Sequence, residues 1–202
     1  MNSKKLAQLF VELISIVAVT NGNFITFDGE CPSADLKPSM INVLPFITNV
    51  EVSAIALTAP LCGINRTDYN AFWEHTDSGT AKITNIIRST ETGECATYLA
   101  YIKDMDPLTG AYDLLYQVAP NTNFAGYKVH FLSFNPSTKT GSALICHNLP
   151  DSRYQVEFTL LSASSSEYDK AAQDEVKTVL ETNNLGYLNP YISGIEHSNK
   201  CY

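Results

Sequence analysis

Cysteine and histidine are the residue types in this chain that are best suited to specific chemistry. The histidines are far apart and lack the spacing of a metal site, and no C-x-x-C pair occurs. G-x-S-x-G, H-E-x-x-H and glycine-rich phosphate loops are also missing. Asp104-Met105-Asp106 begins like a calcium loop, but Pro107 follows and the later acidic ligands are absent, so we interpret it as a turn. We therefore expect no catalytic residues and no metal site. The histidines are His75, His130, His147 and His197.

The five cysteines all follow the N-terminal apolar segment. In an oxidising compartment, this number predicts two disulfides and one remaining thiol. Counting alone leaves the pairing open. The cysteines are Cys31, Cys62, Cys95, Cys146 and Cys201.

The first 22 residues have the layout of a secretory signal peptide. Lys4 and Lys5 precede a mostly apolar run, 6–19, and small residues follow it. The run is too short and too polar for a membrane anchor, so we expect cleavage near residue 22, secretion and no membrane span. The mature part, 23–202, reads as one domain. Asn65, in Asn65-Arg66-Thr67, is then the expected glycosylation site.

The net charge of −8 argues against two classes of partner. Nucleic acids and anionic membrane surfaces are bound through basic patches, and an acidic chain is poorly suited to either. We therefore expect no nucleic-acid partner.

Short apolar or alternating runs separated by turn residues fill the chain from about residue 50 to residue 161. Tyr, Phe, Val, Ile and Thr dominate the runs, while Gly, Pro, Asn and Asp occupy the breaks. Short connections predict antiparallel hairpins, and eight such strands form either a sandwich or a closed up-and-down barrel. The expected strands are 49–59, 67–75, 80–88, 95–103, 111–118, 127–134, 142–147 and 153–162.

One helix is expected after the strands, over about 165–184. Ser164 and Glu167 have the spacing of a capping box. The apolar positions that follow recur every three or four residues, and Asn183, Asn184 and Gly186 end the pattern. A short extended stretch, 191–198, then leads to Cys201. The apolar stripe consists of Tyr168, Ala172, Val176, Val179 and Leu180.

Eight strands, a helix and a final strand near a terminal cysteine resemble the lipocalins. The stretch "GECPSADLKP" before the first strand is similar to the start of insect bilin-binding lipocalins (insecticyanin-like proteins) and of apolipoprotein D relatives. The resemblance implies an all-β, eight-stranded barrel with a C-terminal helix. It also implies the disulfides Cys31–Cys146 and Cys62–Cys201, which leaves Cys95 as the free thiol.

Several lipocalin signatures are missing. The usual G-x-W of the first strand is replaced by Asn49-Val50-Glu51-Val52, and the arginine that packs on that tryptophan is replaced by Ala163. We therefore expect a repacked barrel floor. The loop after the first strand is short, with Pro60 and Leu61 between Ala59 and Cys62, although this loop usually forms a lid.

The function that the resemblance implies is secreted transport of a small hydrophobic ligand in the barrel. Biliverdin or another tetrapyrrole is the first expectation, and fatty acids, retinoids and pheromones are alternatives. By alternation, the candidate interior residues are Tyr69, Trp73, Tyr98, Tyr112, Phe131 and Phe158. Packing of each on the outer face, under the helix, is the structural alternative.

Other functions stay open. A lipocalin without a lid could act through its surface, as an interaction or storage protein, and could form homo-oligomers. Cys95 could be a buried inert thiol, could link to a ligand or a second subunit, or could be the nucleophile of an isomerase.

Overall fold

The computed structural model describes residues 25–33, 35–58, 66–76, 80–103, 105–106, 108–117 and 123–201. The proposed signal peptide, Cys62 and Asn65 lie outside these residues. Within the described part, no helix is both long enough and apolar enough to cross a membrane.

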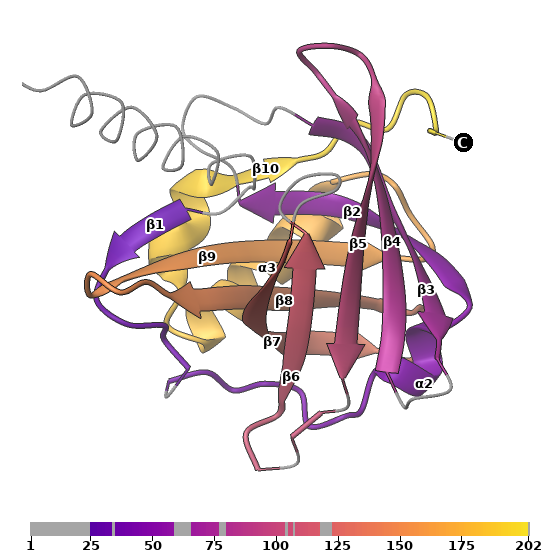
Figure 1. Ribbon diagram of the computed structural model, residues 1–202. Coiled ribbons are helices and arrows are strands. Elements are labelled where there is room, and N and C mark those ends of the chain that lie inside the picture. Colours follow the sequence, from indigo (N-terminus) through magenta and orange to yellow (C-terminus); the bar gives the residue numbers. More distant parts are fainter. Residues whose placement is uncertain are drawn as a thin grey trace, which may run out of the picture.

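Eight antiparallel strands form a closed barrel, as predicted (Figure 1). Each strand pairs with the next along the chain, and the first, β2, also pairs with the last, β9, which closes the barrel. The strands are β2 (Val50–Thr58), β3 (Arg66–His75), β4 (Thr80–Ser89), β5 (Cys95–Lys103), β6 (Ala111–Gln117), β7 (Phe124–Asn135), β8 (Thr140–Asn148) and β9 (Arg153–Ser162).

Two short strands lie outside the barrel. β1 (Ile25–Asp28) pairs with the first half of β9, and β10 (Ile192–Gly194) pairs with the end of β2. β10 falls within the extended stretch that the sequence predicted, whereas β1 was not predicted. Both strands use backbone groups of β2 and β9 that the barrel leaves unpaired, so they extend the sheet beyond the closure point.

A short helix, α2 (Leu44–Ile47), closes one end of the barrel. Leu44 and Ile47 are buried in the interior cluster together with Val43. The hydroxyl of Tyr112 accepts a hydrogen bond from the Val43 backbone N–H at 2.9 Å, which holds the chain entering α2 against the barrel wall. This helix forms the floor of the barrel. The opposite end of the barrel is called the distal end below.

The C-terminal helix, α3 (Lys170–Thr182), covers the outer face of β8 and β9. Its buried side chains are Ala172, Val176, Val179 and Leu180, as the periodicity predicted. The predicted start and capping box were wrong: the N-cap is Asp169, whose side chain accepts a hydrogen bond from Ala172 N at 2.9 Å. An aspartate caps as well as a serine does. A 3₁₀ helix, η2 (Gly186–Tyr191), connects α3 to β10.

The Cys31–Cys146 disulfide is present, with 6.0 Å between the Cα atoms. It ties the segment between β1 and α2 to β8. The Cys31 backbone N–H also donates to Asn148 Oδ1 at 2.7 Å, so this attachment has two points.

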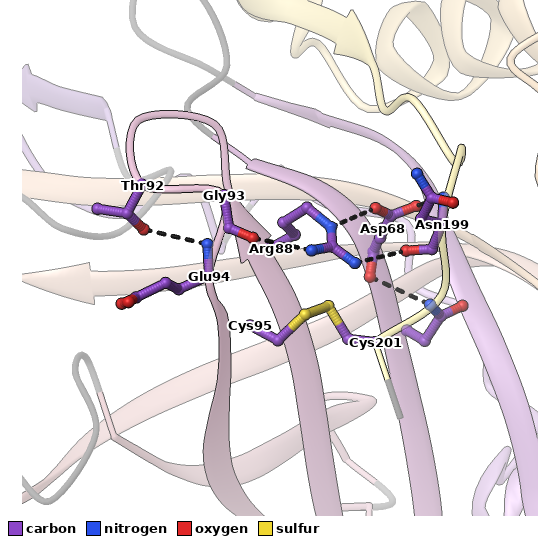
Figure 2. The surroundings of a disulfide bond; sticks show 9 residues. Asp68, Arg88, Thr92, Gly93, Glu94, Cys95, Asn199 and Cys201 are labelled. Carbon is purple, nitrogen blue, oxygen red and sulfur yellow. Dashed lines mark hydrogen bonds and ion pairs between the residues drawn. A yellow bond between two sulfur atoms is a disulfide. The ribbon is translucent and has the colours of Figure 1, made fainter.

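The second disulfide joins Cys95 to Cys201, with a Cα–Cα distance of 5.8 Å (Figure 2). The predicted Cys62–Cys201 bridge and the free thiol at Cys95 were therefore wrong. The interpretations of Cys95 as an inert thiol, a covalent ligand site or a nucleophile fail with them. Cys62 takes part in neither disulfide.

The path of the C-terminal tail explains the pairing. Beyond β10, the tail crosses the outside of β3 and β4 before it reaches β5. Asp68 N donates to Glu196 O at 2.9 Å, and Asn199 N donates to Asp68 Oδ1 at 2.9 Å. Arg88 bonds to Asp68 Oδ2 through Nε at 2.9 Å and to Asn199 O through its terminal NH₂ at 3.0 Å. These contacts bring Cys201 to the start of β5.

Asp68 is the central residue of this attachment. It is 1% exposed and has φ +51°, in the left-handed region. Burial alone would raise the pKa of Asp68, but hydrogen bonds from the Asn199 backbone and the Arg88 side chain lower the pKa overall. The charged carboxylate is therefore the form that holds the tail.

Candidate ligand-binding site

The barrel interior is the candidate site. Alternate side chains of each strand point inward, and the inner set is mostly apolar. An interior cavity of about 60 Å³ is lined by Ala71, Ile83, Ala100, Ile102, Leu114, Val129, Ala143, Ile145 and Leu161, together with several aromatic and polar side chains. The interior is thus almost filled by its own side chains.

Aromatic rings fill the part of the interior next to α2. The Phe131 ring lies between two others, with its centroid 6.5 Å from Trp73 and 5.4 Å from Tyr112. Trp73 is 5% exposed and Tyr112 is fully buried. These rings form the base of the cavity.

A polar cluster lies in the interior toward the distal end. Arg66 and Glu157 are each 5% exposed. The Arg66 side chain hydrogen-bonds to Tyr116, and its guanidinium carbon lies 5.9 Å from the centroid of the Tyr98 ring. Tyr69 donates to Asn85 Oδ1 at 3.2 Å. Burying two charged side chains costs free energy. A barrel core that served only stability would not need these charges.

The electrostatics of this cluster keep its tyrosines protonated. Burial raises the pKa of Tyr69 and of Tyr116, and the nearby Glu157 raises both further. Burial lowers the pKa of Arg66, but Tyr116 and Glu157 more than compensate, so the pKa lies above its ordinary value. The interior therefore offers hydroxyl donors and a permanent cation to a polar group.

Two buried polar atoms in the interior have no partner among the described residues: Trp73 Nε1 and Thr159 Oγ1. Both residues line the cavity. Because buried polar groups are nearly always hydrogen-bonded, these atoms indicate that the cavity holds polar atoms in the functional protein. Water and a ligand could each supply them, and about 60 Å³ is room for roughly two water molecules.

Five of the six predicted interior residues face inward. Tyr69, Trp73 and Phe131 line the cavity, and Tyr112 lies at its closed end. Tyr98 lies toward the distal end, where its ring faces the guanidinium of Arg66.

Phe158 was placed on the wrong face. It is fully buried on the outside of the barrel, in the cluster that β9 forms with α3. The inner residues of β9 are instead Glu157, Thr159 and Leu161. Because the helix covers the outer face, the apolar side of this strand points outward and the more polar side points inward.

The sequence reasoning missed Arg66, Tyr116, Tyr127 and Glu157. Tyr116 and Tyr127 pack edge to face at 6.3 Å, and Tyr127 lies 5.2 Å from the His147 ring. Glu157 carried a usable signal, because it is the single acidic residue in the apolar run "YQVEFTLLS". Arg66 was considered only as the middle residue of the glycosylation sequon.

Comparison with solved structures confirms the architecture. The chain is similar to insecticyanin from the tobacco hornworm Manduca sexta (TM-score 0.64, 17% identity), over 87% of this chain and 90% of that one. Lobster apocrustacyanin A1 gives a TM-score of 0.61 at 10% identity, over 86% and 92% of the two chains. H1 crustacyanin from the lobster Homarus americanus gives 0.61 at 9%, over 86% and 91%. Neither a family model nor a curated protein sequence matches.

The class that these observations define is the lipocalin fold: a closed eight-stranded antiparallel barrel with a C-terminal helix and an added strand. The likeness at this level of identity concerns the fold. The ligand has to be argued from the side chains of this chain.

Proposed function

We propose that the protein binds one small hydrophobic molecule inside the barrel and acts as a carrier. The observation that carries this proposal is the composition of the interior. An apolar, ring-lined base lies next to a buried cluster of Arg66, Glu157 and tyrosine hydroxyls, and two further polar atoms have no partner among the described residues. A few convergent polar groups in an apolar cavity are the usual composition of a ligand site.

The arrangement supports one orientation of the ligand. Its apolar body would lie against Trp73 and Phe131, and its polar group would lie toward Arg66 and Tyr116. The guanidinium donates to carboxylate, carbonyl and hydroxyl oxygens, and the protonated tyrosines add further donors. The ligand class is therefore a hydrophobe with one or more oxygen acceptors.

The present cavity is too small for a drug-sized molecule. Its volume of about 60 Å³ compares with roughly 300–1,000 Å³ in typical ligand pockets. Binding therefore requires interior rings to move outward. Biliverdin or another tetrapyrrole, which the resemblance to insect bilin-binding proteins favours, needs the largest movement. A fatty acid, a retinoid or a pheromone needs less.

The small cavity supports a second function. A barrel that stays filled would act through its surface, as an interaction or storage protein, and self-association would be one such use. A hydrophobe titration that follows Trp73 fluorescence separates the two functions, because only the carrier changes the surroundings of that ring.

We also propose that the protein is secreted, with a mature chain that starts near Asn23 and carries glycan on Asn65. The two disulfides support this, since such bonds form and persist in oxidising compartments. N-terminal sequencing of protein secreted by eukaryotic cells should begin near residue 23. Glycosidase should increase its gel mobility, and N65Q should remove that shift. Met1 on secreted material, or glycosidase-insensitive mobility, would contradict the respective part.

A further inference from the structure

A cavity larger than the interior one lies outside the barrel. This outer groove, of about 380 Å³, runs over the outer face of β6, β7 and β8 and is bordered by residues 31–33 and Leu36. Figure 1 shows the coil between β1 and α2 passing these strands. Unlike the interior cavity, the groove already has the volume of a small-molecule site.

The floor of the groove has an apolar row. Leu115 on β6 and Gly126 on β7 are cross-strand partners that line the groove, and Tyr101 on β5, the other partner of Leu115, continues the row beside the groove. Leu115 is 44% exposed, and a Cβ at Gly126 would meet nothing within 4 Å. The glycine therefore leaves the leucine uncovered. Phe124 extends the apolar surface, with its ring 5.5 Å from Tyr101.

The opposite wall is held in place by the Cys31–Cys146 bridge. Both cysteines line the groove, and Leu36 and Leu144 add apolar surface beside them. Because this disulfide ties the coil to β8, the groove has a fixed width.

A charged row lies next to the apolar one. Asp113 and Lys128 are cross-strand partners joined by an ion pair of 2.5 Å. Ile102 on β5 pairs with Leu114 on β6, so the next residue, Lys103, lies beside Asp113. Lys103 therefore continues the charged row onto β5. No ion pair joins Lys103 to another described residue. The row thus holds two cations and one anion, in a protein with a net charge of −8.

His130 lies two residues after Lys128, on the same face of β7. It provides an independent sign of a ligand. It lines the groove, is 4% exposed, and its Nδ1 has no partner among the described residues. A buried ring nitrogen without a partner is uncommon in proteins. It lies beside the charged row, where a polar head group would be placed.

We propose that the outer groove is a second binding site, which takes an anionic amphiphile with a single carboxylate-type head group. The tail covers Leu115 and Gly126, and the head lies against Lys103, Lys128 and His130. Adjacent rows on one face of a strand are two residues apart, roughly 7 Å, which matches a head and the first carbons of a chain. The proposal is independent of ligand binding inside the barrel.

The test is a titration of ¹⁵N-labelled protein with sodium decanoate, compared with neutral decan-1-ol. We expect decanoate to shift the amide signals of Leu115, Gly126 and Lys128. Phenylalanine in G126F would occupy the groove without a Cβ clash, so this variant should weaken decanoate binding by at least about tenfold. K103M should weaken decanoate binding by roughly threefold to fivefold and leave decanol binding unchanged, as for one exposed charge contact.

K82M is the matched control, because it removes the same charge from Lys82 of β4, which lies outside the groove and pairs with Glu74 of β3. It should bind decanoate like the wild type. Three results would overturn the proposal: G126F binds decanoate normally, K82M weakens binding as much as K103M, or the signals that move belong to residues of the interior on other strands, such as Trp73 and Ile83. The last result would leave the proposed carrier function intact.

Discussion

Replacing Cys95 and Cys201 together by alanine is expected to lower the free energy of unfolding by about 4–5 kcal/mol, in the chain-entropy model of disulfide stabilisation. The bridge spans 106 residues of sequence, so its loss frees a long loop in the unfolded chain. For a domain of this size, the melting temperature should fall by roughly 8–20 °C. The measurements are calorimetry and denaturant unfolding. The double variant avoids a new free thiol that could exchange.

C62A is the control for this experiment. Cys62 belongs to neither disulfide, so its replacement should leave both bridges intact, and peptide mapping without reduction should still join Cys95 to Cys201. The double variant loses Cys201 under either pairing, so a large loss of stability in C62A would contradict the assignment. It would instead support the Cys62–Cys201 bridge that the lipocalin resemblance implied.

Replacing Trp73 by alanine should lower both stability and affinity for an interior ligand. The ring is 5% exposed and packs near Phe131 at the base of the cavity, so its removal should cost about 3–5 kcal/mol of unfolding free energy. Because the same ring lines the cavity, hydrophobe affinity should fall as well. Unfolding midpoint and dissociation constant are measured on the same variant.

F158A is the matched control for W73A. It removes a buried ring from the outer face of the barrel wall, whereas Trp73 lies on the inner face. Phe158 is fully buried under α3 and does not line the cavity. Its loss should cost a similar 3–5 kcal/mol with affinity unchanged in the folded protein. Wild-type affinity in W73A, or a selective loss of affinity in F158A, would remove Trp73 from the site.

The strand order could be predicted because turn residues and alternating runs are local signals. All eight barrel strands lie where these signals placed them, and the apolar stripe of α3 was correct. The face of β9 could not be read in the same way. Both of its faces are buried, so its alternation of Val156 and Phe158 with Glu157 and Thr159 does not identify the interior.

The disulfide pattern shows the limit of inference by resemblance. Cys31–Cys146 follows the lipocalin expectation, but Cys201 is delivered to Cys95 by contacts of Asp68 and Arg88 with the tail. Those contacts join residues more than a hundred positions apart, which no local pattern reveals. The cluster of Arg66, Tyr116 and Glu157 was missed for the same reason, since β3, β6 and β9 meet only in the closed barrel.

The central claim, that the barrel carries a hydrophobic molecule, is tested most directly by titrating the purified protein with biliverdin, a fatty acid and retinol. Trp73 is the sole tryptophan of the chain, and its buried ring should emit at short wavelength. The account predicts that at least one compound changes this emission saturably, at one molecule per chain and micromolar concentration, with strong quenching if biliverdin binds. No binding of any of the three at micromolar concentration would contradict the carrier function and leave the surface function.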